Sequence, residues 1–204
     1  WLGFNGGGVT YWKDGKLQDF GAAQGISPNF SAVFVDRTQR VWVGTRDAGL
    51  FEFVAGRFQP VRYAPLLGRN ILAIHQDRRG RLWVGTDAGL ACWDEHDAVF
   101  NQQSGRAGNK HAAIADDAAG NLWFGTARDG LNRWRDGKFT AIHQTNGLPC
   151  ENIASLCVDD EDVLWVGTGN GLGRLQGGHW TRFGTQDGLA SDSIGYLIED
   201  ERAN

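Results

Sequence analysis

The sequence has little cysteine and proline, and it has no methionine. Among 204 residues there are 3 cysteines, 4 prolines and no methionine. Cys92, Cys150 and Cys157 stand in unlike contexts without a Cys-x-x-Cys spacing, which argues against a zinc site and a disulfide framework. We expect three free thiols, with Cys157 packed as a small apolar residue, and a Cys150–Cys157 bridge is the alternative. Because the chain starts at Trp1 without methionine, we expect a mature fragment or a segment of a longer protein.

Long apolar runs and clusters of positive charge are also absent. No stretch approaches the ~20 apolar residues of a transmembrane helix and no signal peptide is present, so we predict no direct membrane insertion by this segment. The net charge is −4, and no run of Lys or Arg follows a row of aromatic residues, which argues against nucleic acid as a partner. The five histidines form no metal-ligand spacing, so the sequence predicts no metal and no cofactor.

Glycine and tryptophan, in contrast, are abundant, with 30 and 9 residues. Both occur in one repeated motif, which is written most fully as Leu-Trp-Val-Gly-Thr at residues 82–86. Its tryptophans recur every 40 to 42 residues, and the glycine follows two positions later. The full copies contain Trp42 with Gly44, Trp83 with Gly85, Trp123 with Gly125, and Trp165 with Gly167; a degenerate copy contains Trp1 with Gly3. A period of this length predicts a propeller or a solenoid.

Each period divides into four short β segments, which we name A to D in chain order. Segment A is an apolar run such as residues 72–77, and segment B is the Trp-x-Gly-Thr stretch. Segment C begins at the leucine of a Gly-Leu pair such as Leu90, and segment D is short, as in residues 139–142. Hairpin dipeptides such as Asp14-Gly15 separate C from D. Three hairpin turns per period and no helical periodicity predict an all-β propeller of four-stranded antiparallel blades, whereas the coils of a solenoid are usually shorter.

The residues that recur at one position are interpreted as structural. The motif tryptophan and glycine lie on one face of segment B, where a neighbouring sheet is expected to approach closely. An aspartate stands six residues before the tryptophan in four periods; these are Asp36, Asp77, Asp117 and Asp159. We predict that its carboxylate accepts backbone hydrogen bonds in the turn between A and B, rather than having a catalytic role.

The phase of the repeat suggests how the ring closes. The chain opens in segment B, and residues 195–200 are predicted to be a fifth segment A. Five copies of each segment predict one β-propeller domain over residues 1–204, closed by pairing of the C-terminal strand with the N-terminal blade. The alternative is a five-blade segment of a larger propeller.

Candidate binding residues are those that differ between copies. The residues just before segment A are Asn29, Asn70, Lys110, Asn152 and Ser193. Three amides with Lys110 and His111 would form a polar collar that suits an anionic or hydroxylated ligand; in the competing interpretation the asparagines cap turns. The longer B–C turns carry Arg46, Asp47, Arg128 and Asp129, which we expect on the same face as rim contacts or as solvated charge. No catalytic residue is assigned.

Residues 77–90 resemble the two-component regulator propeller repeat, which joins a Gly-Leu-Pro connection and an apolar strand to Asp-x-x-Gly-x-Leu-Trp-(Ile/Val)-Gly-Thr and Gly-Leu. Gly147-Leu148-Pro149 and residues 164–172 also match that pattern. The resemblance implies the periplasmic or extracellular sensor region of a membrane-anchored histidine kinase, hybrid two-component regulator or diguanylate cyclase. Such proteins commonly have seven blades per ring, often two rings, and an immunoglobulin-like stalk.

Together, these observations predict a non-catalytic propeller that senses a small-molecule or oligosaccharide ligand as the input domain of a bacterial signal-transduction protein. A stand-alone interaction scaffold, with a protein partner or self-association, is the alternative. A propeller lyase or glycosidase is less favoured because the sequence shows no acid/base constellation.

Overall fold

A computed structural model describes residues 1–4, 6–63, 66–93, 99–101 and 111–200. It contains five antiparallel sheets, which confirms the predicted all-β fold built from propeller blades. The chain forms two compact units, Trp1–Gln103 with three sheets and Ser104–Asn204 with two. The single closed domain stays a prediction. In the part of the chain that is described, no helix has the length and apolar character needed to cross a bilayer.

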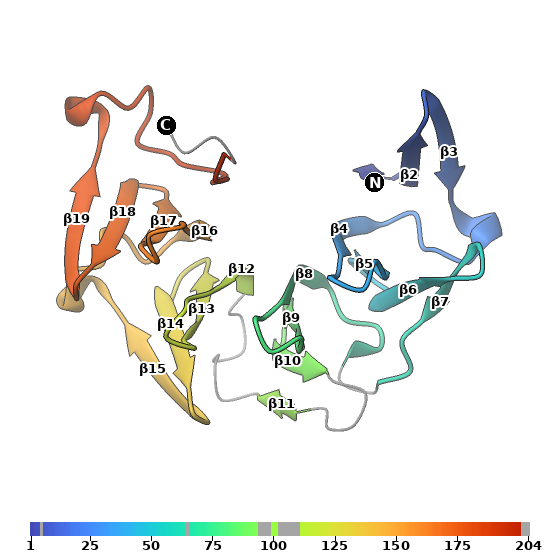
Figure 1. Ribbon diagram of the computed structural model, residues 1–204, viewed down its shortest axis with the longest axis horizontal. Helices are drawn as coiled ribbons and strands as arrows, with labels where there is room; N and C mark the ends of the chain where they lie inside the picture. Colours follow the sequence, from blue (N-terminus) through green and yellow to red (C-terminus); the bar gives the residue numbers. More distant parts are fainter. Residues whose placement is uncertain (5, 64–65, 94–98, 102–110, 201–204) are drawn as a thin grey trace. The chain divides into compact units, whose positions relative to one another are not determined.

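The first unit contains three sheets, whose strands follow one another in chain order (Figure 1). The first sheet has β1 (Leu2–Phe4), β2 (Gly8–Lys13) and β3 (Lys16–Phe20). The second has β4 (Phe30–Val35), β5 (Val41–Thr45), β6 (Leu50–Val54) and β7 (Arg57–Pro60). The third has β8 (Ile71–Gln76), β9 (Leu82–Thr86), β10 (Gly89–Trp93) and β11 (Val99–Asn101). Segments A to D are therefore the successive strands of each four-stranded sheet.

The second unit contains two four-stranded sheets of the same design. One has β12 (His111–Asp116), β13 (Leu122–Thr126), β14 (Leu131–Arg135) and β15 (Lys138–Ile142). The other has β16 (Ile153–Val158), β17 (Leu164–Thr168), β18 (Gly171–Gln176) and β19 (His179–Phe183). Short 3₁₀ turns that the repeat pattern did not predict follow three of the D strands: η1 (Ala22–Gln24), η4 (Gln144–Asn146) and η5 (Thr185–Asp187).

The C–D turns have the backbone conformation that their dipeptides predict. Asp14 has φ 51° and Gly15 has φ 75°, so both central residues are left-handed, as a two-residue type I′ hairpin requires. The dipeptides Ala55-Gly56, Asp136-Gly137 and Gly177-Gly178 have the same pair of positive φ angles. These turns fix the register between strands C and D.

Neighbouring sheets of a unit meet at the motif glycine. A methyl group on Gly44 would lie 2.5 Å from Cγ2 of Ile71, which begins β8 in the next sheet, and Gly125 is covered by Ile153 of β16 in the same way. Figure 1 shows β4 beside β8, and β12 beside β16, where their sheets approach each other. This contact confirms the predicted close approach. Because a side chain at this position would separate the sheets, only glycine permits it.

The motif tryptophan is fixed by the aspartate six residues earlier. Asp36 Oδ1 accepts hydrogen bonds from the backbone N–H of Thr38 and of Arg40 at 2.9 Å, which confirms the predicted role in the A–B turn. Its Oδ2 also accepts the indole N–H of Trp42 at 3.0 Å, a contact that the sequence did not suggest. The corresponding pairs are Asp77–Trp83, Asp117–Trp123 and Asp159–Trp165. The carboxylate therefore fixes both the turn and the ring that packs between sheets.

Each of the four described strands A has a shift in register near its start. The shifts lie between Phe30 and Ala32, Ile71 and Ala73, His111 and Ala113, and Ile153 and Ser155. An extra residue at this position bends the strand where it leaves the D–A connection. Because the irregularity occurs in every one of these copies, we attribute it to the architecture of the blade.

The predicted fifth strand A does not form. Residues 195–200 lie in no strand, and the sheet of β1 has three strands. The segment nevertheless begins like a strand A, because Ile194 packs on Gly167 and the side chain of Glu199 accepts a hydrogen bond from Asp160 N at 2.7 Å. A single extended segment without a ladder partner lacks the hydrogen bonds that define a strand. The expectation of a strand is therefore wrong for the described structure, and closure of the ring stays a prediction.

Candidate functional site

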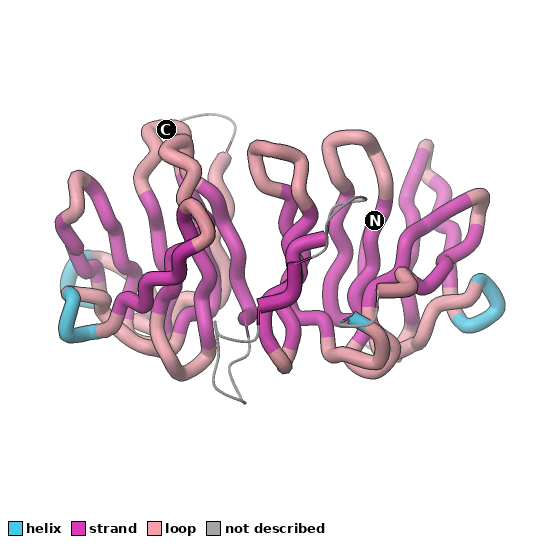
Figure 2. The backbone as a smooth tube through the Cα atoms, turned by 90° about the horizontal axis from the view of Figure 1, so that it is seen from below, coloured by secondary structure: helices cyan, strands magenta, loops and turns pink. Residues whose placement is uncertain are grey.

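The B–C turns and the D–A connections lie at the same end of the sheets in each unit (Figure 2). We call this end the loop face of each unit. Its B–C turns are residues 46–49, 87–88, 127–130 and 169–170, and its described D–A connections are residues 21–29, 66–70, 143–152 and 184–193. This is the face on which the sequence predicts the ligand site.

The threonine of the motif closes each B–C turn. Thr45 Oγ1 donates to the carbonyl of Gly49 at 2.9 Å and accepts the N–H of Ala48 at 3.0 Å. Thr86, Thr126 and Thr168 make the same two kinds of bond, and all four are fully buried. Since one side chain satisfies both a donor and an acceptor of the turn, the turn keeps its shape whatever residues project from it.

The asparagines before strand A are equivalent in the structure. The backbone carbonyls of Asn29, Asn70 and Asn152 accept the N–H of the residue that follows the motif threonine, at 2.8, 3.1 and 3.3 Å. Each bond joins a D–A connection to the B–C turn of the sheet it enters. The backbone therefore supplies this link, and a role of the three side chains in binding stays a prediction.

In the first unit, predicted site residues come together around Asp47. Its carboxylate accepts hydrogen bonds from Asn29 Nδ2 at 2.5 Å and from Ser27 Oγ at 2.8 Å. These two bonds lower the pKa of Asp47, so the carboxylate stays ionised at neutral pH. Arg46 is exposed beside it. Asn29, Arg46 and Asp47 were predicted from the sequence, whereas Ser27, which lies two positions before Asn29, was not.

In the second unit, the longer B–C turn lies near a different set of partners. Arg128 is exposed, and the turn is held to the D–A connection because Gly130 N donates to the carbonyl of Glu151 at 3.0 Å. The Glu151 carboxylate accepts from Gln144 N at 2.9 Å and lies 3.1 Å from Nδ1 of His143. Asp129 N donates to Oγ1 of Thr126, as Ala48 N donates to Oγ1 of Thr45 in the first unit.

Two of the predicted collar residues are not placed as side chains. Lys110 lies outside the described residues. His111 is the first residue of β12, and the structure describes its backbone only. The collar of three amides, Lys110 and His111 therefore stays a prediction.

Each of the last two D–A connections is held by an acidic residue at the same repeat position, which was not predicted from the sequence. Glu151 precedes Asn152, and Asp192 precedes Ser193 at the same repeat position. Asp192 Oδ1 accepts from Thr185 N at 2.8 Å, and its backbone carbonyl accepts from Gly171 N. Aligning the two copies from Gly147 and Gly188 would have revealed this pair of acidic residues.

The chemistry of the loop face suits binding. The Ser27–Asn29–Asp47 network contains no imidazole, and the lowered pKa of Asp47 makes it a poor proton acceptor for the Ser27 hydroxyl. Within the described residues, no three His, Cys, Asp or Glu side chains gather as metal ligands. Cys92, Cys150 and Cys157 are not joined by disulfides. Exposed guanidinium, amide and carboxylate groups are suited to hydrogen-bond a polar ligand.

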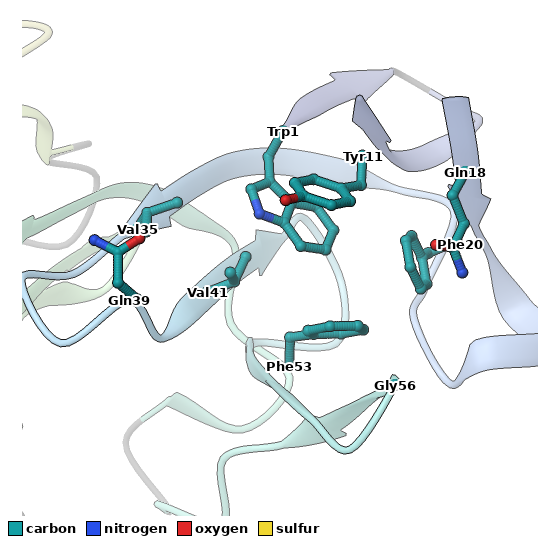
Figure 3. Close-up of a pocket in the computed structure, with 9 residues that line it drawn as sticks. All are labelled: Trp1, Tyr11, Gln18, Phe20, Val35, Gln39, Val41, Phe53 and Gly56. Carbon is teal, nitrogen blue, oxygen red and sulfur yellow. The ribbon is translucent and has the colours of Figure 1, made fainter. Parts of the chain in front are cut away.

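A groove that the sequence did not predict lies between the first two sheets of the first unit (Figure 3). This groove has a volume of about 580 Å³ and is lined by Trp1, Tyr11, Gln18, Phe20, Val35, Gln39, Val41, Phe53 and Gly56. The rings of Trp1 and Tyr11 lie 4.7 Å apart between centroids, and those of Trp1 and Phe53 lie 5.2 Å apart. We call it the aromatic groove. Tyr11 and Phe53 come from strands C of neighbouring sheets, a pairing that depends on tertiary packing.

The sequence profile of the two-component regulator propeller matches residues 65–88 and 147–170. Two segments of the chain thus match the two-component regulator propeller repeat. The two matches span a D–A connection, strand A and strand B in the first and second units. No curated protein matches the chain.

Solved structures with the same fold include extracellular domains of bacterial regulators. The extracellular domain of the hybrid two-component system BT3049 from B. thetaiotaomicron has a TM-score of 0.80 and 20% identity, over 94% of this chain and 28% of that one. That of BT4673 from the same organism has a TM-score of 0.70 and 20% identity, over 98% and 36%. Virginiamycin B lyase from Staphylococcus aureus has a TM-score of 0.66 and 15% identity, over 83% and 60%.

At these identities the likeness establishes the propeller fold. This chain spans about a third of the length of each of the two bacterial regulator domains. The same fold carries an enzyme in the lyase, so the fold does not by itself determine function.

Proposed function

We propose that this chain is the non-catalytic recognition part of an extracellular or periplasmic sensor, and that it binds a polar ligand on the loop face. The repeat family and the two regulator domains support the sensor role. The observation that carries the proposal is the backbone of the loop face. Threonine and carbonyl bonds of the same kind hold the turns, whereas the projecting side chains differ between repeats. A fixed backbone that presents variable side chains is suited to recognition.

The chemistry of the projecting groups defines the class of ligand. Arg46 and Arg128 are exposed guanidinium groups, and the ionised carboxylate of Asp47 already accepts two hydrogen bonds. The loop face of the first unit thus offers a charged donor and a carboxylate, and the loop face of the second unit offers a charged donor of its own. We expect a ligand with several hydroxyl groups, or with hydroxyl and carboxylate groups together, such as an acidic oligosaccharide. In this proposal the ligand shifts the packing between blades, and an output domain elsewhere in the protein detects the change.

A thermal-shift screen of neutral and acidic oligosaccharides tests the proposal. A ligand present at 100 times its Kd stabilises the folded chain by about 2.7 kcal/mol, which raises Tm by several degrees. We expect Arg46→Ala and Arg128→Ala to reduce the shift produced by an acidic ligand, because each removes a charged hydrogen-bond donor. Lys110→Ala tests the predicted collar in the same assay.

Arg57→Ala is the matched control, since Arg57 is an exposed cation beside a C–D turn, at the other end of the strands. It should leave the ligand-induced shift unchanged. If no oligosaccharide raises Tm, or if Arg57→Ala reduces the shift as much as the loop-face variants do, ligand sensing on the loop face is wrong. Turnover of a bound ligand would instead support a propeller enzyme.

A further inference from the structure

A cluster of positive charge lies on the hairpin of β14 and β15 in the second unit. Arg133 and Arg135 stand two residues apart on β14, so their side chains point to the same face of the sheet. Thr140 lies opposite Arg133, and Lys138 lies opposite Arg135. Residues directly opposite each other on antiparallel strands share a face. Three cations and a hydroxyl group therefore lie together, and we call these four residues the cationic hairpin.

The cationic hairpin borders a hollow with a volume of about 390 Å³. Its lining consists of the four residues of the cationic hairpin and Asp136 of the C–D turn. Arg135 and Lys138 are exposed. Arg133 is half-buried, and its guanidinium lies over the ring of Trp123, with Cζ 6.0 Å from the ring centroid. The hollow is thus open to solvent, and packing holds one of its cations in place.

The charge of the cationic hairpin is compensated only in part. Nε of Arg135 lies 3.6 Å from Oδ2 of Asp136, but the side chain of Asp136 is 79% exposed, and such surface pairs are weak. Among the described residues, neither Arg133 nor Lys138 makes an ion pair. Three cations and Asp136 leave the lining with a net charge of +2.

The motif aspartate of this sheet does not supply the missing negative charge. Oδ2 of Asp117 accepts hydrogen bonds from Nδ2 of Asn121 at 2.6 Å and from the indole N–H of Trp123 at 2.9 Å. Asp117 is also buried, so its carboxylate does not turn toward the hollow. Two uncharged donors hold it in the A–B turn, and Arg133 is left without a carboxylate partner.

The architecture of the blade does not require this cluster. Arg135 opposite Lys138 is a like-charge pair, which destabilises a sheet. The corresponding pairs of the other hairpins with described C–D turns are Lys13 with Lys16, Val54 with Arg57, and Gln176 with His179. Where a second like-charge pair occurs, in β2–β3, the position of Arg133 is occupied by Tyr11. Among these four hairpins, only β14–β15 thus has three Lys or Arg side chains on one face, and a bound anion would offset their repulsion.

We propose that the cationic hairpin binds the phosphate group of a small molecule. Two guanidinium groups and one ammonium group donate charge-assisted hydrogen bonds to phosphate oxygens, and the hydroxyl of Thr140 adds an uncharged donor. A phosphate monoester carries nearly two negative charges at neutral pH, which matches the net charge of the lining. The hollow has room for a phosphate with a sugar-sized group attached. The site lies at the C–D end of the strands, away from the loop face, and does not depend on the ligand proposed there.

Calorimetric titration of the chain with glucose 6-phosphate, glucuronate and glucose tests the charge requirement. The three molecules share a six-membered sugar ring and carry about two, one and no negative charges at about pH 7.5. In low salt we expect a Kd of ~1 mM or lower for glucose 6-phosphate, binding at least about tenfold weaker for glucuronate, and none for glucose. Raising NaCl from ~20 mM to ~200 mM should weaken phosphate binding severalfold. Equal binding of glucose 6-phosphate and glucuronate, or binding of neither, overturns the proposal.

Inorganic phosphate shows which part of the ligand is recognised. Because the cations contact the phosphate group, inorganic phosphate should bind within about tenfold of glucose 6-phosphate. If glucose 6-phosphate binds and inorganic phosphate does not, the chain recognises the sugar, and the assignment to the cationic hairpin is wrong.

Four variants locate the binding. Lys138→Gln should weaken glucose 6-phosphate binding at least about fivefold, and Lys138→Glu should abolish it. Lys138→Glu also replaces a like-charge pair with an opposite-charge pair, so its Tm without ligand should equal or exceed that of the parent chain, which separates lost binding from misfolding. Asp136→Asn removes the negative charge beside the hollow and should strengthen binding about twofold to fivefold.

Arg57→Gln is the matched control for Lys138→Gln. Arg57 is an exposed cation at the same repeat position of the first unit, but it lies opposite Val54, so it belongs to no cluster of cations. It should leave phosphate binding unchanged. If Arg57→Gln weakens binding as much as Lys138→Gln does, or if Lys138→Glu binds glucose 6-phosphate normally, the phosphate lies elsewhere and the assignment is wrong.

Discussion

The sheets β4–β7 and β16–β19 surround the motif tryptophan with the same two groups, but they take one of them from different parts of the chain. In both sheets an aspartate accepts the indole N–H, at 3.0 Å from Trp42 and at 2.6 Å from Trp165. In the first sheet the guanidinium over the ring comes from Arg40 in the A–B turn. In the second it comes from Arg174 on strand C. The repeat therefore retains an interaction, and the residue that provides it can change.

The two aspartates differ in their burial and in the hydrogen bonds that they accept. Asp36 is 2% exposed and accepts bonds from Thr38, Arg40 and Trp42. Asp159 is half-buried and accepts two backbone bonds and the indole bond. Because Val163 replaces the arginine in the second sheet, no ion pair forms with the turn residue there. The first sheet should thus depend more strongly on its carboxylate.

The largest expected effect is the loss of Asp36. Asp36→Ala removes the buried carboxylate of an ion pair with Arg40, whose side chain is 35% exposed, and it leaves the indole N–H of Trp42 unpaired, so it should lower the free energy of unfolding by about 2–4 kcal/mol. Asp159→Ala should cost about 1–3 kcal/mol, because the half-buried carboxylate accepts hydrogen bonds only from uncharged donors. Urea unfolding followed by circular dichroism measures both. The comparison fails if the Asp159 variant is the less stable; Asp136→Asn, on an exposed turn, is the control.

The next effect compares the motif glycines of the same two sheets. Gly44→Ala would place a methyl group 2.5 Å from Cγ2 and 2.7 Å from Cβ of Ile71, which belongs to a strand. We expect a cost of about 1–3 kcal/mol from overpacking. Gly167→Ala would place its methyl group against Oγ of Ser155, which can rotate away, and 2.9 Å from Cγ2 of Ile194, which lies in no strand, so it should cost less. Thermal unfolding tests the order. Gly21→Ala is the control, since a methyl group there meets no atom within 4 Å.

A smaller effect concerns acid stability in the first sheet. Burial by itself raises the pKa of Asp36, but hydrogen bonds from Trp42, Thr38 and Arg40 outweigh it and lower the pKa to about 2. Since the ordinary value is 3.8, this stabilisation is complete above about pH 4 and is lost as pH falls through about 2. Trp42→Phe removes one donor and should raise the Asp36 pKa, as carboxyl carbon NMR titration would show. An unchanged pKa in this variant would contradict the account.

The smallest effect compares the two arginines. Arg40→Leu loses a hydrogen-bonded pair with Asp36 and the contact with the ring, so we expect a cost of about 1 kcal/mol. Arg174→Leu should be nearly neutral, because Nε of Arg174 is buried without a hydrogen-bond partner and leucine removes that unsatisfied donor. Urea unfolding of the two variants in parallel provides the test, and a larger cost for Arg174→Leu would reverse the interpretation.

The sequence predicted the blades well, because their signals are local. The Asp-Gly turn at Asp14-Gly15 and the Trp-x-Gly-Thr motif each act within a few residues, and the motif recurs every 40 to 42 residues. The sheets confirm both signals. The prediction of a fifth strand A was wrong for a physical reason. A strand needs a ladder partner, and residues 195–200 lack one in the described sheets. Apolar alternation indicates a strand but does not supply its partner.

The binding residues were predicted less completely, because they depend on contacts across the fold. Asn29 and Asp47 were named separately, and only the structure joins them through Ser27. The equivalence of Asn29 with Asn152 was predicted from the repeat, and their carbonyl bonds confirm it. The aromatic groove was missed, since Tyr11 and Phe53 are far apart in the sequence and meet only when two sheets pack.

By itself, the sequence determined the repeat, the strand order within each blade and the kind of turn, because hydrogen bonding and backbone preference act between residues close in the chain. It also predicted the resemblance to the two-component regulator propeller repeat, which matches two segments of the chain. Only the tertiary structure decided that the motif aspartate holds the tryptophan ring, that an arginine from either of two positions covers it, and that Tyr11 and Phe53 meet in the aromatic groove. These features depend on packing between strands and sheets, which a local pattern does not encode.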